Sequence, residues 1–351
     1  MSESLIPSAS QVSLDKPEAI TSFGRFPITR ELGRGAIGIV YLGHDPAIDR
    51  AVAIKTFSPK LSAAVRMQCE IQFTNEARAA GRLSHPNIVT IFETSREGNS
   101  YYIVMEYLEG IELGKLLKGG KKFTYDEVAG IIFKLTDALA YMHKRGVIHR
   151  DLKPDHVFLE PGNIPKIMDF GIARSPNRIS DPTADQGDPY TLYAGKPLGT
   201  PYYMSPEQAT GNDLDLRTDI YSLGAIMFEL LVGAKPFTAA NKDLAQLLDQ
   251  IAHKAAPIPH EVNPAIPKSL SDIVAKAMSK RPEKRYQFAE EMSLDLRRYM
   301  ARERRSRKQA RIGGKPPVPV EQRRAVVEVQ PERNIVSKGI GAIAGLFGRK
   351  T

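Results

Sequence analysis

The sequence contains only one cysteine, Cys69, so the chain cannot form an internal disulfide. This scarcity fits a protein kept in a reducing compartment, and we expect a cytoplasmic protein. Long apolar runs are also missing, because the best candidates, residues 220–232 and 340–347, fall short of the ~20 residues that a membrane-spanning helix needs. Residues 1–22 have no apolar segment behind positive charge, so we expect no secretory signal peptide.

Basic and acidic residues are unevenly placed along the chain. The whole sequence has 49 Lys+Arg and 40 Asp+Glu, a formal net charge of +9. Residues 301–351 contain 13 of the basic and 4 of the acidic residues, so this segment carries the whole excess. With 42% hydrophobic and 25% charged residues, the chain has the composition of a globular protein. We expect a flexible leader over residues 1–25, one large domain over residues 26–300 and a basic, disordered tail over residues 301–351.

Two acidic residues follow one another in neighbouring loops. Residues 149–156 read His-Arg-Asp-Leu-Lys-Pro-Asp-His, a proline-broken loop, and the strand-like run 157–159 comes directly after it. Asp169 lies ten residues beyond Leu159 and begins an Asp-Phe-Gly triplet. One carboxylate, Asp151, can accept the proton of an attacking hydroxyl while Asp169 holds a magnesium ion. The pattern therefore suits phosphoryl transfer from a nucleotide.

Three glycines near the N-terminus form the pattern G-x-G-x-x-G. Gly33, Gly35 and Gly38 lie between two strand-like runs, and their missing side chains let backbone N–H groups approach phosphates closely. Dinucleotide-binding folds share this pattern but continue into a helix, whereas residues 39–42 read as a strand. The next strand-like run, Ala-Val-Ala-Ile-Lys, ends at Lys55.

In this order, the glycines, Lys55, His-Arg-Asp and Asp-Phe-Gly make the chain resemble eukaryotic-type (Hanks-type) serine/threonine protein kinases, and residues 204–209, Met-Ser-Pro-Glu-Gln-Ala, are similar to the bacterial branch. The resemblance implies an α+β, two-lobed protein-kinase fold. Its small, mainly β N-lobe would span about residues 26–105, its hinge 106–110, and its larger, mainly α C-lobe 111–300. The implied function is ATP-dependent phosphorylation of serine or threonine hydroxyls on a protein substrate, with autophosphorylation of the activation segment between residues 171 and 205.

The resemblance also implies roles for individual residues. Asp151 would be the catalytic base, Lys153 would neutralise the transferring phosphoryl group, and Thr200 would tie the activation segment to both. Lys55 would reach the α- and β-phosphates of ATP and pair with Glu76. The other residues expected around the nucleotide are Leu32, Gly33, Gly35, Gly38, Val40, Ala53, Met105, Glu106, Leu108 and Phe158.

Four further residues resemble supporting positions of the family. Asp219 would hold the backbone of the catalytic loop, and Arg285 would form a buried ion pair with Glu207. Arg150 could pair with a phosphorylated residue of the activation segment. Separately, Thr-Tyr-Asp-Glu at residues 124–127 is a capping box that predicts the start of a long helix.

One position departs from the family pattern. Five residues after Asp151 the family has an asparagine that binds a second magnesium ion, whereas this chain has His156. Magnesium prefers oxygen ligands, and nearby cations are expected to resist protonation of this imidazole. Two outcomes stay open: a kinase that relies mainly on Mg²⁺ or Mn²⁺ at Asp169, or a pseudokinase that serves as a nucleotide-binding scaffold. We favour the enzyme because the other motif residues are present.

The basic tail has its own alternatives. Its arginine-rich start, residues 302–311, could bind an anionic membrane, nucleic acid or an acidic partner, and the apolar stretch 339–347 could lie on a membrane surface. A solvated, disordered tail is the simpler interpretation. A third hypothesis makes the tail the working part and the preceding domain its regulator. The sequence leaves the oligomeric state open.

Overall fold

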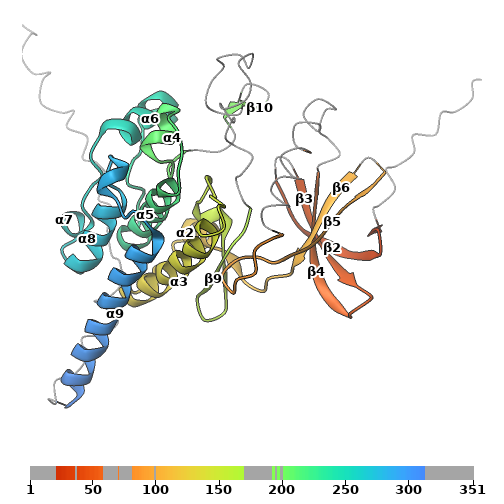
Figure 1. The fold of residues 1–351 in the computed structure, drawn as a ribbon, viewed down its shortest axis with the longest axis horizontal. Coiled ribbons are helices and arrows are strands. Elements are labelled where there is room, and N and C mark those ends of the chain that lie inside the picture. Colours follow the sequence, from red (N-terminus) through yellow and green to blue (C-terminus); the bar gives the residue numbers. More distant parts are fainter. Residues whose placement is uncertain are drawn as a thin grey trace, which may run out of the picture.

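The computed structural model describes residues 21–35, 38–57, 70, 81–98, 100–169 and 201–312, together with the backbone of residues 192–193 and 196–197. Figure 1 shows two parts, a twisted β-sheet built from the first third of the chain and a larger body of helices. This arrangement confirms the predicted α+β, two-lobed fold, with a small, mainly β lobe and a larger, mainly α lobe.

The sheet contains six antiparallel strands in the order β1-β2-β3-β4-β6-β5. They are β1 (Ser22–Phe23), β2 (Phe26–Arg34), β3 (Gly38–Asp45), β4 (Arg50–Phe57), β5 (Ile91–Glu97) and β6 (Ser100–Glu106). Alternate side chains along these strands bury a small core formed by Phe23, Phe26, Val52, Ile54, Tyr102 and Val104. The register sets Lys55 opposite Val40 on one side and Ile103 on the other, so the lysine lies in the middle of the sheet.

The larger body follows the segment 107–110. Its helices are α2 (Leu113–Lys118), α3 (Tyr125–His143), α4 (Pro206–Thr210), α5 (Arg217–Val232), α6 (Leu244–His253), α7 (Pro259–Val262), α8 (Lys268–Ala277) and α9 (Ala289–Ile312), with short 3₁₀ turns η1 (Pro154–His156), η3 (Ala240–Lys242) and η4 (Pro282–Lys284). A three-stranded sheet joins β7 (Ile111–Glu112), β8 (Val157–Glu160) and β9 (Ile164–Ile167), and β10 (Leu192–Tyr193) pairs with β11 (Lys196–Pro197).

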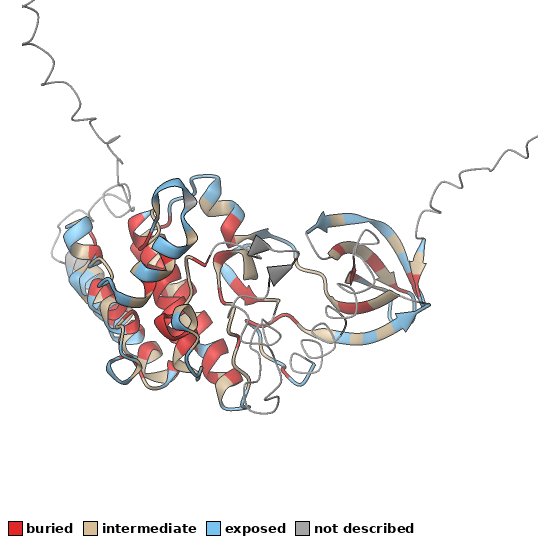
Figure 2. Ribbon diagram, turned by 90° about the horizontal axis from the view of Figure 1, so that it is seen from above, coloured by how far each residue is buried: buried red, intermediate tan, exposed pale blue. Residues whose placement is uncertain are grey.

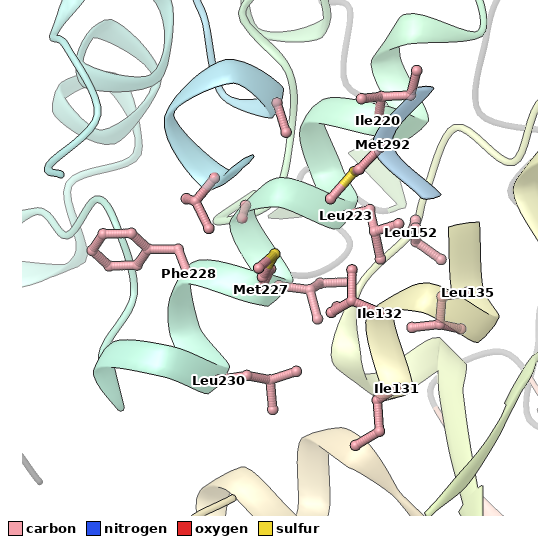
Figure 3. Packing of buried hydrophobic residues seen from close by; sticks show 14 of the residues in the cluster. Ile131, Ile132, Leu135, Leu152, Ile220, Leu223, Met227, Phe228, Leu230 and Met292 are labelled. Atoms are coloured by element: carbon pink, nitrogen blue, oxygen red, sulfur yellow. The ribbon is translucent and has the colours of Figure 1, made fainter. Parts of the chain in front are cut away.

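Helices α3 and α5 form the centre of this body. The predicted capping box is confirmed, because the Thr124 hydroxyl accepts from the Glu127 N–H at 3.2 Å and the Glu127 carboxylate accepts from the Thr124 N–H at 2.7 Å. Figure 3 shows Ile132 and Leu135 of α3 beside Leu223 of α5, all fully buried. Figure 2 shows how strongly buried residues concentrate in this body, which makes it the rigid support for the loops at its edge.

Both expected ends of the domain differ from the structure. Strand β1 begins at Ser22, inside the predicted leader, because the buried Phe23 packs into the core of the sheet. Helix α9 continues to Ile312, so residues 301–312 are helical and do not belong to a disordered tail. Its contact with α3 explains the extension, because Arg307 pairs with Asp126. In the described part of the chain, no helix is long and apolar enough to cross a membrane.

Candidate active site

A cavity of about 1270 Å³ is lined by both the β-sheet and the helical body. Its size is sufficient for a nucleotide, since ligand pockets in proteins measure about 300–1,000 Å³. Glu76 and Thr200, two of the predicted site residues, lie outside the described residues. The other predicted site residues all line this cavity: Leu32, Gly33, Gly35, Gly38, Val40, Ala53, Lys55, Met105, Glu106, Leu108, Asp151, Lys153, His156, Phe158 and Asp169.

The three glycines at the mouth of the cavity have different surroundings. A Cβ atom on Gly38 would lie 2.5 Å from the carbonyl oxygen of Thr56, so close packing of β3 on β4 requires glycine there. Among the described residues, a Cβ on Gly33 would meet nothing within 4 Å, and one on Gly35 would only touch the Gly38 carbonyl at 3.8 Å. Packing therefore does not explain Gly33 and Gly35, whereas a ligand that approaches their backbone does.

The β8–β9 hairpin brings the two acidic loops together. Val157 of β8 pairs with Ile167 of β9, and the Met168 N–H donates to the His156 carbonyl at 3.0 Å. From the catalytic loop, the His149 ring forms a hydrogen bond at 3.2 Å to the Met168 carbonyl. Asp151 and Asp169 thus lie on loops that are tied to each other and face one cavity.

Asp219 binds the backbone of the loop at residues 149–156, as the resemblance to the kinase family implied. Its carboxylate accepts hydrogen bonds from the backbone N–H groups of His149 and Arg150, both at 2.8 Å, and contacts the His143 ring at 2.9 Å. The side chain is fully buried in helix α5. Burial acts to raise the pKa of Asp219, but the bonds to His143 and the loop outweigh it and lower that pKa. The carboxylate therefore stays ionised and anchors the loop.

Two loop residues of the cavity that are not glycine have left-handed backbone. Arg150 has φ 65° and Asp169 has φ 54°. Such conformations are uncommon for residues with a Cβ and cluster at functional sites. Arg150 directly precedes Asp151, which the sequence predicts to be the catalytic base. Asp169 itself carries the carboxylate that is predicted to bind the metal.

Each acidic residue has a lysine as partner. The Lys55 ammonium lies 2.5 Å from Asp169, and the Lys153 ammonium lies 3.0 Å from Asp151. Burial by itself raises the pKa of Asp169, but the charge of Lys55 outweighs it and holds this pKa well below its usual range. Asp169 is therefore a carboxylate at neutral pH, as a metal ligand must be.

The profile of the protein kinase domain matches residues 26–295. The chain belongs to the protein kinase family. Among its relatives, Pkn1 of Myxococcus xanthus is 40% identical over 271 residues, PrkC of Bacillus subtilis 36% over 275 and PknB of Mycobacterium tuberculosis 35% over 276. All three are named serine/threonine-protein kinases, which confirms the resemblance to the bacterial Hanks-type branch.

These matches cover 75%, 78% and 78% of this chain but 36%, 40% and 42% of the relatives, so the chain spans about two-fifths of their length. Among solved structures, the kinase domain of PknI from Mycobacterium tuberculosis matches with a TM-score of 0.59 at 25% identity, over 79% of this chain and 96% of that domain. The fold is therefore that of a protein kinase.

His156, which departs from the kinase pattern, is held by the catalytic loop. Its Nδ1 atom lies 2.9 Å from the Asp151 carbonyl and 3.5 Å from the Asp151 carboxylate. Burial lowers the pKa of His156 to about 4, more than Asp151 and Asp169 raise it. The neighbouring Lys153 acts in the same direction as burial but contributes less. Neutral imidazole whose Nδ1 donates to a carbonyl leaves Nε2 with a free lone pair, so His156 can act as a metal ligand.

The predicted kinase ion pair between Arg285 and Glu207 is confirmed. The Nη1 and Nη2 atoms of Arg285 lie 2.6 and 2.7 Å from the two carboxylate oxygens of Glu207, and the Arg285 side chain is fully buried. The adjacent Gln208 donates from its side-chain amide to the Arg150 carbonyl at 2.6 Å. Helix α4 is therefore linked both to the late part of the domain and to the catalytic loop.

The sequence interpretation missed two residues: Gly110, which lines the cavity, and Lys166, which contacts the lining residue Glu106. Gly110 ends the segment after β6, and a Cβ there would overlap the Leu159 carbonyl oxygen, so only glycine fits against β8. Lys166 lies buried in β9, with its ammonium 2.7 Å from Glu106. The sequence around Lys166, Ile-Pro-Lys-Ile, contains no signal for its burial.

Proposed function

We propose that this chain transfers the γ-phosphoryl group of ATP to serine or threonine hydroxyls of a protein substrate. The observation that carries the proposal is one cavity whose lining includes Lys55, Asp151, Lys153 and Asp169 together with the three glycines at residues 33, 35 and 38. Phosphoryl transfer needs positioning and charge neutralisation more than covalent chemistry, and these residue types supply both. The proposed place of action is the cytoplasm, where ATP is available.

The nucleotide would lie between the two lobes. Leu32, Val40 and Ala53 from the sheet and Phe158 from β8 would cover the faces of the adenine, while Met105 would close the back of its pocket. The Glu106 N–H already donates to the Thr90 carbonyl at 2.9 Å, so its own carbonyl and the Leu108 backbone are the groups left for the adenine edge. Gly33, Gly35 and Gly38 would carry backbone N–H groups to the phosphates.

A divalent cation fits Asp169, because magnesium is usually held by one or two carboxylates and by the phosphates of its substrate. When bound, such a cation neutralises the phosphate oxygens during transfer. Among the described residues, no cluster of three or more His, Cys, Asp or Glu side chains forms a self-sufficient metal site. The neutral ring of His156 would complete the donor set and favours Mn²⁺ over Mg²⁺.

The proton of the substrate hydroxyl would go to the Asp151 carboxylate. Lys153, whose ammonium is 3.0 Å from that carboxylate, would place positive charge beside the transferring group. Lys55 would exchange its contact with Asp169 for the α- and β-phosphates once nucleotide enters, with Glu76 as its partner. That exchange frees the Asp169 carboxylate for the cation.

A pseudokinase that only binds nucleotide is the second candidate, and His156 is the observation that favours it. The deciding measurement is transfer of radiolabelled phosphate from ATP to the chain itself and to a generic basic protein, with Mg²⁺ and Mn²⁺ tried separately. The Asp151→Asn variant is the control for contaminating kinases. Transfer that requires Asp151 supports the enzyme, whereas nucleotide binding without transfer under either metal supports the scaffold.

Autophosphorylation of the activation segment is part of the proposal. The Arg150 Nε atom is buried and finds no hydrogen-bond acceptor among the described residues. A phosphate group on the segment would supply one, and Thr200 would connect that segment to the catalytic residues. Residues 170–200, which hold the candidate hydroxyls, lie outside the described side chains. Mass spectrometry of the chain after incubation with ATP tests this part.

We also propose that the basic end of the chain contacts an anionic membrane or an acidic partner. Arg302, Arg304, Arg305 and Lys308 are exposed on the last turns of α9. Sedimentation with vesicles of anionic and of neutral lipid tests the membrane. Binding that needs anionic lipid and falls with salt supports it, and equal recovery with both lipids contradicts it.

A further inference from the structure

A partly buried ion pair connects the two lobes beside the cavity. Lys166 is only 9% exposed, and lysine is almost never buried without a partner. Its ammonium lies 2.7 Å from the Glu106 carboxylate, whose side chain is 28% exposed. This contact joins β9 of the larger lobe to the end of β6 in the smaller lobe.

Both partners stand next to parts of the proposed nucleotide site. Glu106 is the last residue of β6, directly before the segment 107–110, and Lys166 lies three residues before Asp169. The second carboxylate oxygen of Glu106 accepts from the Thr90 N–H at 3.3 Å, and the Glu106 N–H donates to the Thr90 carbonyl at 2.9 Å. The carboxylate is therefore fixed in direction.

Strand β9 is equally fixed. The Ile167 N–H donates to the Asn87 carbonyl, and the Val89 N–H donates to the Ile167 carbonyl, both at 2.9 Å. The Asn87 side-chain amide donates to the Pro165 carbonyl at 2.8 Å. Strand β9 is therefore paired with β8 on one side and with residues 87–89 on the other, and it ends two residues before Asp169.

A buried ion pair adds little net stability over an apolar pair of similar volume, and in some proteins its role is to fix how the elements that it joins are arranged. We propose that Lys166 is a positioning residue. Through Glu106 it sets the distance between the hinge, which receives the adenine, and Asp169, which receives the metal and phosphates. This inference rests on the proposed function, because it concerns the site for ATP.

Comparison of two ligands tests the inference. Adenosine contacts the hinge end alone, whereas ATP with magnesium contacts both ends, so only ATP depends on their separation. In the Lys166→Met variant we expect calorimetry to show about a tenfold loss of affinity for ATP with magnesium and less than a twofold change for adenosine. The Lys166→Arg variant, which keeps the ion pair, should restore most of the loss.

Lys144→Met is the matched control. Lys144 also forms an ion pair at 2.8 Å, with Glu290, but the two side chains are 68% and 43% exposed and do not line the cavity. Both affinities should be unchanged in this variant. A merely structural role for Lys166 would lower the melting temperature without separating the two ligands.

Two results would overturn the inference: unchanged affinity for ATP in Lys166→Met, or an equal loss for adenosine and ATP. If Lys166→Met does not fold, Glu106→Gln carries the same comparison, because it removes the charge and keeps a hydrogen-bonding side chain. These are binding measurements, so they are read independently of phosphate transfer, whose absence would contradict the proposed function alone.

Discussion

Replacement of Arg285 by methionine should destabilise the whole larger lobe. All five N–H groups of this guanidinium are used: two bind Glu207, and the others donate to the carbonyls of Ser279, Lys280 and Arg217 at 2.7, 2.9 and 3.1 Å. Methionine fills much of the volume but satisfies none of these acceptors. Removal of one partner of a buried ion pair costs about 3–5 kcal/mol, a large part of the 5–15 kcal/mol by which domains are stable.

Urea unfolding followed by circular dichroism measures this loss. Arg298→Met is the control, because Arg298 also pairs at 2.9 Å, with Asp295, but its side chain is 62% exposed. An exposed pair contributes below about 1 kcal/mol. A loss below about 1 kcal/mol in Arg285→Met as well would refute the reasoning.

The pH dependence supplies a second check. Burial raises the pKa of Glu207, but Arg285 outweighs it and lowers that pKa. In the unmodified chain this carboxyl therefore contributes stability above its unfolded pKa, and the contribution is lost as pH falls through the folded pKa. Without Arg285, burial is opposed mainly by the hydrogen bonds from the Thr218 hydroxyl and from the Glu207 backbone N–H, so we expect the carboxyl to gain a proton more readily in the folded variant than in its unfolded state. The stability difference should therefore narrow from pH 7 to pH 5, and a constant difference would contradict the account.

Three further predictions concern the cavity. Gly35→Ala should raise the KM for ATP about tenfold without changing the urea midpoint, because its Cβ would enter the cavity. Gly38→Ala should lower the free energy of unfolding by about 1–3 kcal/mol, because its Cβ would press on the Thr56 carbonyl. Equal behaviour of the two variants would contradict this assignment. His156→Asn should increase turnover with Mg²⁺ relative to Mn²⁺, and an unchanged metal preference in steady-state kinetics would count against His156 as a ligand. Burial lowers the pKa of His156 to about 4, so this ring stays neutral from pH 6 to 8. Nucleotide affinity should therefore show the same pH profile over this range in the unmodified chain and in the His156→Asn variant.

The sequence predicted those features whose residue type is dictated by chemistry. Asp151 and Asp169 must be acidic to do their proposed work, and the pattern around them predicted that their loops are neighbours. The resemblance to the kinase family added Lys55 to the same site, and all three residues line one cavity. The pair of Arg285 with Glu207 was predicted through the resemblance to the kinase family, and the structure confirms it.

Other features depend on contacts that no local pattern encodes. Lys166 has the sequence surroundings of an ordinary strand lysine, and its burial depends on Glu106, sixty residues earlier. The end of α9 was not predicted because its last turns are rich in arginine, although Arg307 among them pairs with Asp126 of α3. Lys55 contacts Asp169, and this contact depends on the conformation of the lysine side chain, which the positions of the residues in the sequence do not determine.

The left-handed backbone of Arg150 and Asp169 implies that stability of the fold and activity make opposite demands at these two positions. Each such residue costs of order 1–3 kcal/mol, which glycine would not. A glycine at either position would remove the backbone strain. It would also remove the guanidinium or the carboxylate to which we assign a role in the proposed function. Directed evolution for heat resistance alone should therefore find glycine at these two positions, and selection for phosphate transfer should remove it again.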